Sequence, residues 1–399
     1  MEETLARQVA ARGLPGGSDA VLYHRAIARL EGLMAVYDDG STPQLLMTTY
    51  DYLGLQGHPL LNARAKEAID AFGTGGHCTG AAAGMFVAHR RLEERLAAWL
   101  GQEDAILFPS GYQANLSAPQ ALAGAGDWVF SDSLNHASIV DGCHLARARG
   151  AQLRVFGHND IADLRRQLAL APSEVTKLVI CDAVFSADGD LLRLADVDDA
   201  CRRYGAVLLL DEAHSFAALG PHGRGIYDHF ALRPTCALLT MATLSKTLAS
   251  VGGFLAGPGA VIASLRGAAR GYVFSAALPA PAVAAAHAAL DLLETEGEQR
   301  RGDLSGNISY FLHRARAAGI PLPADCRSGV LPVLIGDERR ALETADHCRR
   351  HGVMVVPFVW PVCARGAARL RVNVTARHTR LDIDTAVARI AAALEATAP

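Results

Sequence analysis

Short apolar runs alternate with helix-like segments through the middle of this 399-residue chain. Amphipathic stretches that predict helices lie between the runs, for example at 88–100, 137–149, 161–170 and 197–204. Strands that alternate with helices are typical of a mostly parallel sheet covered on both faces. The pattern therefore predicts an α/β fold with a seven-stranded sheet flanked by helices. The expected strands are 105–108, 128–131, 153–156, 177–182, 206–211, 236–241 and 253–256.

The pattern changes near residue 281, where two long helices are expected at 281–296 and 299–318. Shorter strands and helices follow, which predicts a smaller α+β C-terminal domain. The expected strands are 330–335, 353–357 and 370–374, and the expected helices are 338–351 and 382–397. We therefore expect an N-terminal helical segment (1–45), a large domain (46–280) and the C-terminal domain (281–399).

Composition excludes several classes of function. The formal charge is −3, and no long run of one sign indicates nucleic acid or an anionic membrane surface. The longest apolar stretches, such as 276–290, are too short to span a bilayer. The first residues are acidic and lack an apolar core, so a signal peptide is not expected and the protein is predicted to be cytoplasmic.

The cysteines favour the same compartment. None of the eight forms a Cys-x-x-Cys pair, and several lie in apolar stretches, as reduced, buried thiols do. Cys143-His144 and His347-Cys348 are each too little for a zinc site, so no metal is expected.

Two of the predicted strands lead to residues of opposite charge. The run 206–211 ends in Asp211, and Lys246 follows the run 236–241. Alone, Asp211 reads as a turn-capping aspartate and Lys246 as a solvated lysine. Together they suit pyridoxal phosphate, which needs a lysine for its Schiff base and a carboxylate beside its pyridine nitrogen. Ligands of parallel sheets bind at the carboxyl ends of the strands, where both residues are expected.

Polar neighbours extend this candidate site. His214 lies three residues after Asp211, and Thr243 and Ser245 flank Lys246, where hydroxyls can hold a phosphate. Ser110 and Gly111 follow the strand 105–108 and open a helix, an arrangement that binds anions at the helix N-terminus.

His136 follows the strand 128–131. Two roles are open to it: it can cap the next helix, or it can stack on a pyridine ring.

These motifs, in this order, resemble the α-oxoamine synthases. The similar segments are FPSGYQAN (108–115), LNHAS (134–138), DEAH (211–214), TLSK (243–246), and RLR (369–371) followed by TARHT (375–379). DYLGL (51–55) and HP (58–59) match the N-terminal signature of the family, so the resemblance runs from about residue 46 to the end. SKTLASVGGF (245–254) is most similar to serine palmitoyltransferases; the family also includes 8-amino-7-oxononanoate synthase, 2-amino-3-ketobutyrate ligase and 5-aminolevulinate synthase.

The resemblance implies fold-type I pyridoxal phosphate chemistry and a role for each matching residue. Lys246 would form the Schiff base, Asp211 would pair with the pyridine nitrogen, and His214 would contact the ring oxygen. His136 would stack on the ring and contact the substrate carboxylate. The phosphate would be held by Ser110, Gly111, Tyr112, Thr243 and Ser245.

Three further roles follow from the resemblance. Ser186 would contact the cofactor near its ring oxygen. Ser275 would reach the phosphate from a partner subunit, which implies a homodimer with shared active sites. Arg371 would clamp the carboxylate of the amino acid with its bidentate fork.

The family reaction is a decarboxylative condensation. An amino acid displaces the lysine, loses its Cα proton and attacks an acyl thioester, and loss of carbon dioxide leaves an α-aminoketone. The resemblance thus implies a pyridoxal phosphate-dependent acyltransferase that uses glycine, alanine or serine.

Two departures from the family pattern bear on the substrate. In GTGGHCTG (73–80) a glycine replaces the arginine that many members carry, and Tyr50 replaces an asparagine. Both favour a specialised biosynthetic synthase, whose donor could be a carrier-protein thioester or a CoA thioester. Thr79 matches the threonine of the glycine-using aminolevulinate synthases, and its extra methyl group favours glycine and then alanine.

Other readings stay open at this point. One is an aldolase, lyase or aminotransferase on the same fold, which the segment 369–379 counts against. The other is a non-catalytic partner subunit, which the presence of Lys246, Asp211 and His136 counts against.

Overall fold

The structure, a computed structural model, describes residues 22–398. The chain divides into two compact units that are treated separately below. The larger unit comprises Leu53–Ser186 and Leu191–Arg301. The smaller unit comprises Ala187–Asp190, Gly302–Pro399 and the described part of Met1–Tyr52. The boundary in the C-terminal half falls at residue 301, whereas the sequence placed it at residue 280.

The larger unit is built on the expected seven-stranded sheet, so the predicted fold class is confirmed. Its strands run in the order β4-β10-β9-β8-β7-β5-β6. β10 is antiparallel to both of its neighbours, and the other pairs are parallel. The strands are β4 (Asp104–Phe108), β5 (Trp128–Asp132), β6 (Gln152–Phe156), β7 (Lys177–Asp182), β8 (Val207–Asp211), β9 (Ala237–Thr243) and β10 (Gly253–Gly257).

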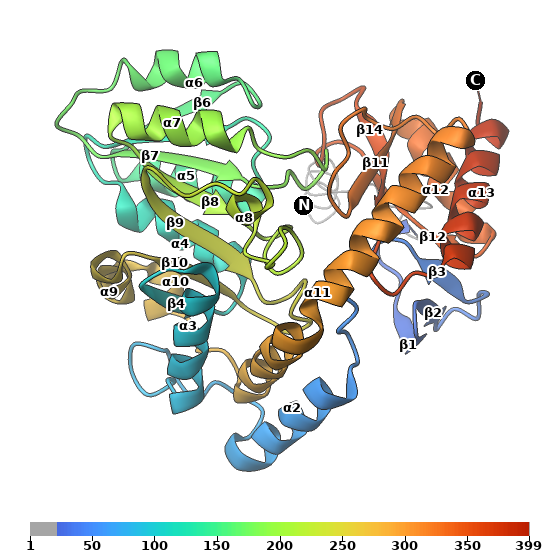
Figure 1. Cartoon of the computed structure of the whole chain (residues 1–399), viewed down its shortest axis with the longest axis horizontal. Helices are drawn as coiled ribbons and strands as arrows, with labels where there is room; N and C mark the ends of the chain where they lie inside the picture. Colours follow the sequence, from blue (N-terminus) through green and yellow to red (C-terminus); the bar gives the residue numbers. More distant parts are fainter. Residues whose placement is uncertain (1–21, 399) are drawn as a thin grey trace, which may run out of the picture. The chain divides into compact units, whose positions relative to one another are not determined.

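Helices cover both faces of this sheet (Figure 1). Successive strand residues point to opposite faces, so Leu178 and Ile180 pack with one helix layer and Val179 and Cys181 with the other. The first layer contains α4 (Gly111–Leu122), α5 (Ala137–Ala148), α9 (Gly259–Ala268) and α10 (Arg270–Val273). The second contains α6 (Ile161–Leu168), α7 (Leu194–Tyr204) and α8 (Ile226–His229). The unit also includes α2 (Pro59–Phe72), α3 (Val87–Leu100) and the first part of α11 (Ala280–Ala317).

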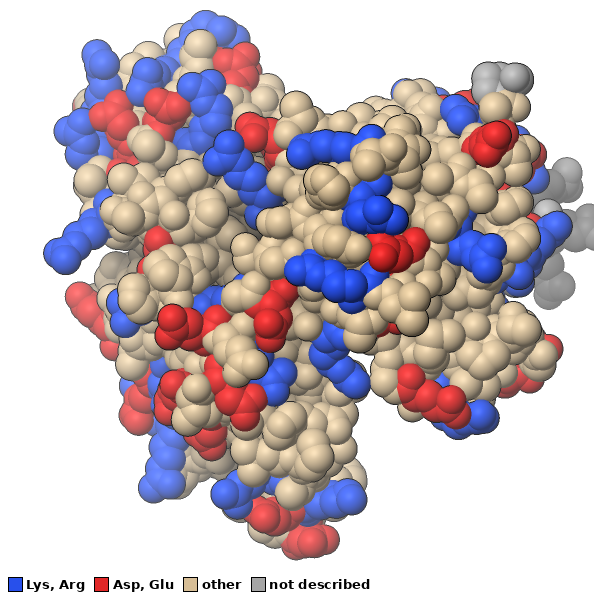
Figure 2. Space-filling view, turned by 45° about the vertical axis from the view of Figure 1, so that its right-hand side comes forward, with Lys and Arg blue, Asp and Glu red and all other residues tan. Residues whose placement is uncertain are grey.

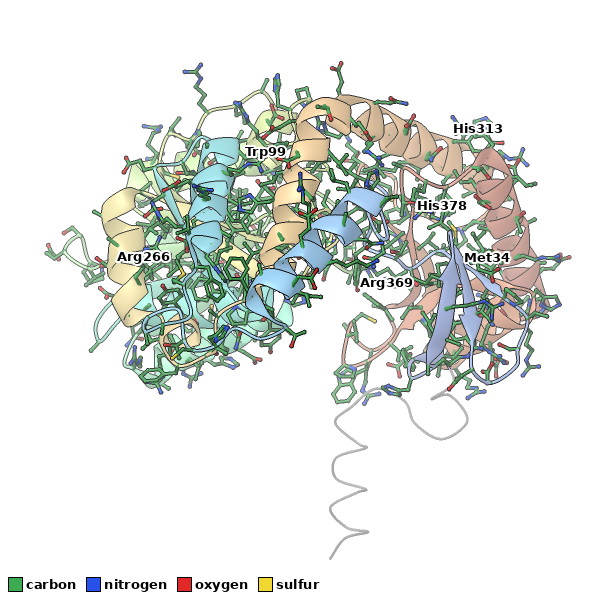
Figure 3. All side chains as sticks on the ribbon, turned by 90° about the horizontal axis from the view of Figure 1, so that it is seen from below. Met34, Trp99, Arg266, His313, Arg369 and His378 are labelled. Atoms are coloured by element: carbon green, nitrogen blue, oxygen red, sulfur yellow. The ribbon has the colours of Figure 1, made fainter. Side chains whose placement is uncertain are left out.

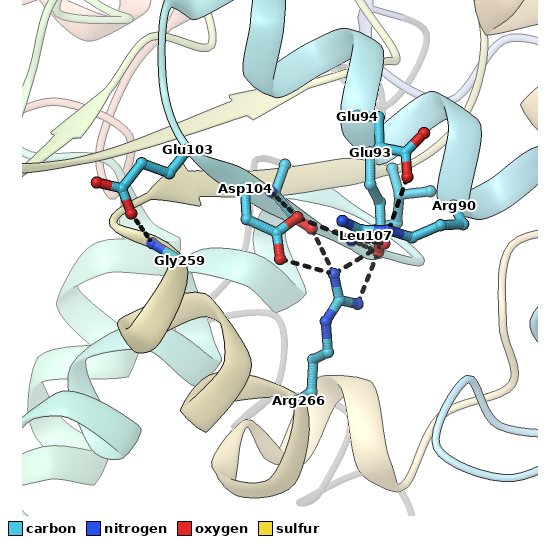
Figure 4. A network of polar contacts seen from close by, with 9 residues as sticks. Arg90, Glu93, Glu94, Glu103, Asp104, Leu107, Gly259 and Arg266 are labelled. Atoms are coloured by element: carbon cyan, nitrogen blue, oxygen red, sulfur yellow. Dashed lines mark hydrogen bonds and ion pairs between the residues drawn. The ribbon is translucent and has the colours of Figure 1, made fainter.

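A buried ion pair occupies the free edge of β4 (Figure 4). Glu93 of α3 is fully buried, and its carboxylate accepts the Leu107 N–H at 3.0 Å. Arg266 of α9 pairs with Glu93 at 2.9 Å and donates to the Ala105 carbonyl at 2.8 Å. The two side chains therefore satisfy backbone groups that a further strand would otherwise pair. β4 leads directly into the turn at Ser110 and Gly111.

We expect Glu93→Ala to lower the free energy of unfolding by about 3–5 kcal/mol, because it removes the buried carboxylate that pairs with Arg266 and accepts the Leu107 N–H. Urea denaturation measures this. Glu94→Ala is the matched control, since Glu94 pairs with Arg90 from the same helix but is exposed, and its loss should cost about 1 kcal/mol or less. Equal losses for the two variants would contradict the role of Glu93.

The smaller unit contains two sheets. A four-stranded sheet has the order β1-β2-β3-β12, and a three-stranded antiparallel sheet has the order β11-β14-β13. Its elements are β1 (Ile27–Glu31), β2 (Met34–Tyr37), β3 (Gln44–Leu46), β11 (Val330–Gly336), α12 (Glu338–Arg350), β12 (Val353–Met354), β13 (Val356–Phe358), β14 (Ala368–Asn373), α13 (Arg380–Ala396) and the end of α11. The buried His378, labelled in Figure 3, links the loop after β14 to β3, because its Nε2 lies 3.2 Å from the Leu46 carbonyl oxygen.

The expected N-terminal helical segment is wrong where the structure can be compared with it. Residues 27–46 form three strands, and Gly32, with a φ of +66°, makes the turn between β1 and β2. Glycine adopts this left-handed conformation without strain, which permits the tight hairpin. The rest of that prediction, residues 1–21, lies outside the described residues.

Two further expectations are corrected. The helices 281–296 and 299–318 are one helix, α11, which continues through Gly297. A helix tolerates an internal glycine at a cost of about 1 kcal/mol relative to alanine, and packing of the rest of α11 offsets that cost. The strand 353–357 is instead two short strands, β12 and β13, which belong to different sheets.

The surface carries both signs of charge. On the face in Figure 2, acidic and basic side chains are interspersed. Within residues 22–398 no helix is long and apolar enough to cross a membrane.

Candidate active site

Two aspartates meet at the carboxyl edge of the larger sheet. Asp182 ends β7 and Asp211 ends β8, and the two are direct partners in the strand register. Asp211 is buried, and both of its oxygens accept hydrogen bonds. Oδ1 accepts the Ala213 N–H at 2.8 Å, and Oδ2 accepts Nδ2 of Asn115 at 2.7 Å. The carboxylate is therefore held in one orientation.

Lys246 and His214 lie together beyond the neighbouring strand ends. The lysine Nζ is 2.9 Å from Nε2 of His214. The last residue of β9 and the turn that follows carry the expected hydroxyls, with Thr243 Oγ1 and Ser245 Oγ 2.7 Å apart. The structure thus brings Lys246 next to His214, and Thr243 next to Ser245, as the sequence predicted.

The N-terminus of α4 packs tightly against the start of β10. A Cβ atom at Gly253 would lie 2.5 Å from the Gly111 Cα, and one at Gly111 would lie 3.2 Å from the Thr243 Cβ. Ser110 caps α4 by accepting the Gln113 N–H at 3.1 Å. The first N–H groups of α4 and the Thr243 side chain therefore lie close together. Such a helix N-terminus suits a phosphate group, so these residues fit pyridoxal phosphate.

His136 is the N-cap of α5, which was one of the two roles expected for it. Its Nδ1 accepts the Ser138 N–H at 3.3 Å and lies 2.7 Å from Ser138 Oγ. Its backbone N–H donates to Asp182 at 2.9 Å. Its ring meets the Tyr112 ring edge-on, with centroids 6.3 Å apart. The Tyr112 hydroxyl donates to Asp141.

Burial dominates the electrostatics at this edge of the sheet. Burial, and next the Asp211 carboxylate, raise the pKa of Asp182 well above its ordinary value, while the Lys246 charge acts in the opposite direction. Burial also raises the pKa of Glu212 to about 7, although Ser215 and the Ile226 N–H donate to its carboxylate. The hydrogen bond to Asp141 is the main cause of a raised pKa at Tyr112.

The other expected residues of the larger unit lie in loops. Ser275 Oγ accepts Nε2 of Gln113 at 3.0 Å, so it lies beside α4 of its own chain. Thr79 forms an isolated antiparallel bridge with Ala276, which places the Thr79 backbone next to the Ser275 segment. Ser186 is half-buried in the loop after β7.

Arg371 and Tyr50 meet in the smaller unit. The Arg371 guanidinium lies 4.8 Å from the centre of the Tyr50 ring, and its Nε donates to Asn373 at 3.2 Å. Its Nη2 is buried and has no hydrogen-bond partner within the described chain. Arg369, labelled in Figure 3, forms an ion pair with Asp188 instead. An orphaned donor on Arg371 fits the binding of an anion.

The sequence reasoning assigned no role to three polar residues at the site, although it placed Asp182 at a strand end where ligands bind: Asn115, Ser138 and Asp182. All three are buried. Two signals pointed to Asn115: it ends the segment FPSGYQAN that resembles the family, and it follows Gly111 by four residues, about one helical turn. Among residues 22–398, no cluster of three or more His, Cys, Asp or Glu side chains is placed to hold a metal.

Comparisons with known proteins agree with this geometry. The model of the aminotransferase class I and II family matches residues 42–390. An 8-amino-7-oxononanoate synthase from Anaeromyxobacter dehalogenans is 41% identical over 347 residues, which cover 86% of this chain and 85% of that protein. A 4-hydroxy-2,2'-bipyrrole-5-methanol synthase from Serratia is 38% identical over 92% of this chain but only 56% of its own length.

A solved structure adds the cofactor. A single-substitution variant of the serine palmitoyltransferase of S. paucimobilis, solved with a pyridoxal phosphate–myriocin aldimine bound, matches with a TM-score of 0.90 and 30% identity, covering 99% of this chain and 97% of that one. The fold, the cluster around Lys246 and these similarities lead to one assignment. The chain belongs to the α-oxoamine synthases, pyridoxal phosphate-dependent acyltransferases within the aminotransferase class I and II family.

Proposed function

We propose that this synthase joins a small amino acid, glycine first and then alanine or serine, to an acyl thioester in a specialised biosynthetic pathway, with release of carbon dioxide. The observation that carries the proposal is the contact of Lys246 with His214 beyond the carboxyl edge of a sheet at which Asp211 is held by two donors. A lysine, an imidazole and a fixed carboxylate are the groups that this condensation needs.

Each group has a distinct task. Pyridoxal phosphate, when bound, supplies an electron sink for the pair left when the amino acid loses its Cα proton. We propose that Lys246 holds the cofactor and then carries that proton, and that Asp211 pairs with the pyridine nitrogen. His214 would contact the ring oxygen, and its Nε2 lies 2.9 Å from the lysine amine. His136 would stack on the ring, and Ser186 would contact the cofactor near its ring oxygen.

The phosphate subsite follows from the tight packing at Gly111 and Gly253. We propose that the first N–H groups of α4, at Gly111 and Tyr112, bind the phosphate together with the hydroxyls of Ser110, Thr243 and Ser245. The close backbone approach supports this, because a side chain at residue 253 would push the α4 N-terminus away.

The substrate preference rests on Thr79 and Tyr50. The Thr79 methyl group reduces the room for an amino-acid side chain, which favours glycine. Tyr50 lies against the guanidinium of Arg371, which we propose as the carboxylate clamp. The donor is proposed to be a carrier-protein or CoA thioester. The 8-amino-7-oxononanoate synthase and the 4-hydroxy-2,2'-bipyrrole-5-methanol synthase make different products and are 41% and 38% identical to this chain. Sequence identity alone therefore does not identify the product of this enzyme.

Arg371→Lys is expected to raise the KM for the amino acid about 100-fold, because a lysine cannot reproduce the bidentate contact. Steady-state kinetics with the amino acid varied measures this. Arg369→Lys is the matched control, since Arg369 lies two residues away on the same strand but is paired with Asp188. A larger KM effect from Arg369→Lys than from Arg371→Lys would reverse the assignment.

Mass spectrometry of the products tests the proposed function directly. The purified protein is incubated with pyridoxal phosphate, a panel of amino acids, and acyl groups carried on CoA or on a carrier protein. An α-aminoketone that lacks the amino-acid carboxyl group supports the proposal. A keto acid would indicate an aminotransferase, an aldehyde from the amino acid would indicate an aldolase, and a colourless protein without activity would indicate a non-catalytic subunit.

We further propose a homodimer in which Ser275 serves the phosphate of the partner subunit. Ser275 also contacts Gln113 of its own chain. The alternative is therefore that Ser275 serves the phosphate site of its own subunit. Mixed dimers of Lys246→Ala and Ser275→Ala subunits decide between them. If Ser275 acts across the interface, one site of each mixed dimer is intact and activity returns. If it acts within its own chain, no site is intact.

The proposed compartment is the cytoplasm. All eight cysteines lie in the described part of the chain and are free thiols, as expected under reducing conditions.

A further inference from the structure

A buried asparagine joins two residues of the proposed site. Asn115 lies on α4, is 1% exposed, and uses both hydrogens of one amide nitrogen. Nδ2 donates to Oδ2 of Asp211 at 2.7 Å and to Oγ of Ser138 at 3.0 Å. These contacts link α4 to the end of β8 and to the first turn of α5.

The second contact continues to His136. Ser138 Oγ is 2.7 Å from Nδ1 of His136, and the Ser138 N–H also donates to that nitrogen at 3.3 Å. A backbone N–H can only donate, so Nδ1 is an acceptor and the proton of the neutral imidazole is on Nε2. The Ser138 hydroxyl then donates to His136 and accepts from Asn115. The hydrogen bonds therefore run in one direction, from Asn115 through Ser138 to His136.

The unused end of the amide distinguishes Asn115 from a structural asparagine. Oδ1 of Asn115 is buried and has no hydrogen-bond partner among the residues that the structure describes. The nearby Asn135 has both ends satisfied, since Nδ2 donates to Ser131 and Ile180 and Oδ1 accepts the Asp182 N–H. An orphaned buried acceptor destabilises a fold, so the two donated hydrogen bonds are what this side chain contributes.

We propose that Asn115 is a positioning residue that orients Asp211 and His136 as a pair. The inference rests on the proposed function, in which Asp211 faces the pyridine nitrogen and His136 lies on the ring. A single amide then fixes the carboxylate at one side of the cofactor and, through the Ser138 hydroxyl, the plane of the imidazole at another. Ser138 takes part only in orienting His136, because it lies between Asn115 and His136.

The test compares three variants of the holoenzyme by visible circular dichroism, pyridoxal phosphate titration and steady-state kinetics. Asn115→Leu keeps the volume and removes both donated bonds. We expect the dissociation constant for pyridoxal phosphate to rise about 10- to 100-fold, kcat to fall by a similar factor, and the visible dichroism of the bound cofactor to change.

Asn307→Leu is the matched control. Asn307 is also a buried amide, but it donates to the Thr375 and His378 carbonyls of the smaller unit. Its loss should lower Tm without changing the cofactor's dissociation constant or visible dichroism.

Ser138→Ala separates the contact of Asn115 with Asp211 from its link to His136. We call this link, from Asn115 through Ser138 to His136, the relay, and this variant tests it even if Asn115→Leu does not fold. It retains the contact between Asn115 and Asp211, so cofactor affinity should stay within about threefold of wild type. The KM for the amino acid should rise about tenfold or more, because His136 loses the hydroxyl that donates to its Nδ1 at 2.7 Å and keeps only the backbone N–H at 3.3 Å.

The relay is overturned if Asn115→Leu matches Asn307→Leu in dichroism and cofactor affinity, or if Ser138→Ala leaves the amino-acid KM unchanged. Either result leaves the proposed function standing when the wild type binds pyridoxal phosphate and forms product. A wild type that binds no pyridoxal phosphate would instead overturn the proposed function, and the relay with it.

Discussion

Replacing Lys246 with alanine is expected to abolish turnover while the protein remains folded. The other lysines of the chain are Lys66, on α2, and Lys177, at the start of β7. Lys177 is buried and reaches the Ser173 carbonyl at 3.4 Å. Neither lies in the turn after β9, so no other amine can replace Lys246 in holding the cofactor or in carrying the Cα proton.

Borohydride reduction followed by peptide mapping checks this assignment. With pyridoxal phosphate present, the reduced label should lie on the peptide that contains Lys246, and the Lys246→Ala protein should carry none. Lys66→Ala is the matched control and should keep both label and activity. Label on Lys66 or Lys177 in the wild type would remove the basis for the proposed mechanism.

The chemistry at the strand ends was predictable because it follows from local pattern. An apolar run of five or six residues that stops at a charged residue marks the end of a buried strand, and parallel strands align their carboxyl ends. That logic identified Asp211 at the end of one strand and Lys246 three residues after the end of the next, before any contact was known. The structure adds their partners, such as His214 at 2.9 Å from the lysine amine.

Asn115 shows where sequence reasoning reaches its limit. Its partner Asp211 is 96 residues away, and no periodicity relates α4 to β8. Helix geometry alone does not say which residue after Gly111 faces the site. That is decided by how α4 packs on α5 and on the sheet. Glu93 is similar, because it reads as one of several charged residues on a helix until β4 is known to need an edge partner.

The prediction of a helical N-terminal segment was wrong for a different reason. β1 is exposed along its whole length and lacks a buried face, so it carries none of the alternation that marks a half-buried strand. Tertiary pairing with β2 and the turn at Gly32 determine its conformation. Strands of this kind depend on their neighbours more than on their own residues.

Asp211→Asn is expected to retain the cofactor but lose most of its activity. A neutral amide cannot pair with a protonated pyridine nitrogen, so the ring becomes a poor electron sink. The local geometry adds a second cost. Ala213 and Asn115 each donate to a different oxygen of Asp211, and an amide has only one oxygen, so one donor would face an NH2 group. We expect kcat to fall about 100- to 1000-fold, as when one preorganised electrostatic group is removed from an active site.

Single-turnover kinetics and a visible spectrum of the variant measure this effect. Asp132→Asn is the matched control, because Asp132 is a buried aspartate at the end of β5 that accepts the Leu134 and Asn159 N–H groups. Asp132→Asn should lose stability because one of these two N–H donors would face an NH2 group. The folded variant should nevertheless turn over near the wild-type rate. If Asp211→Asn also retains the wild-type kcat, the carboxylate does not act on the pyridine nitrogen. The buried Asp182 beside it, whose pKa is raised chiefly by burial and next by Asp211, would then be the acid to test.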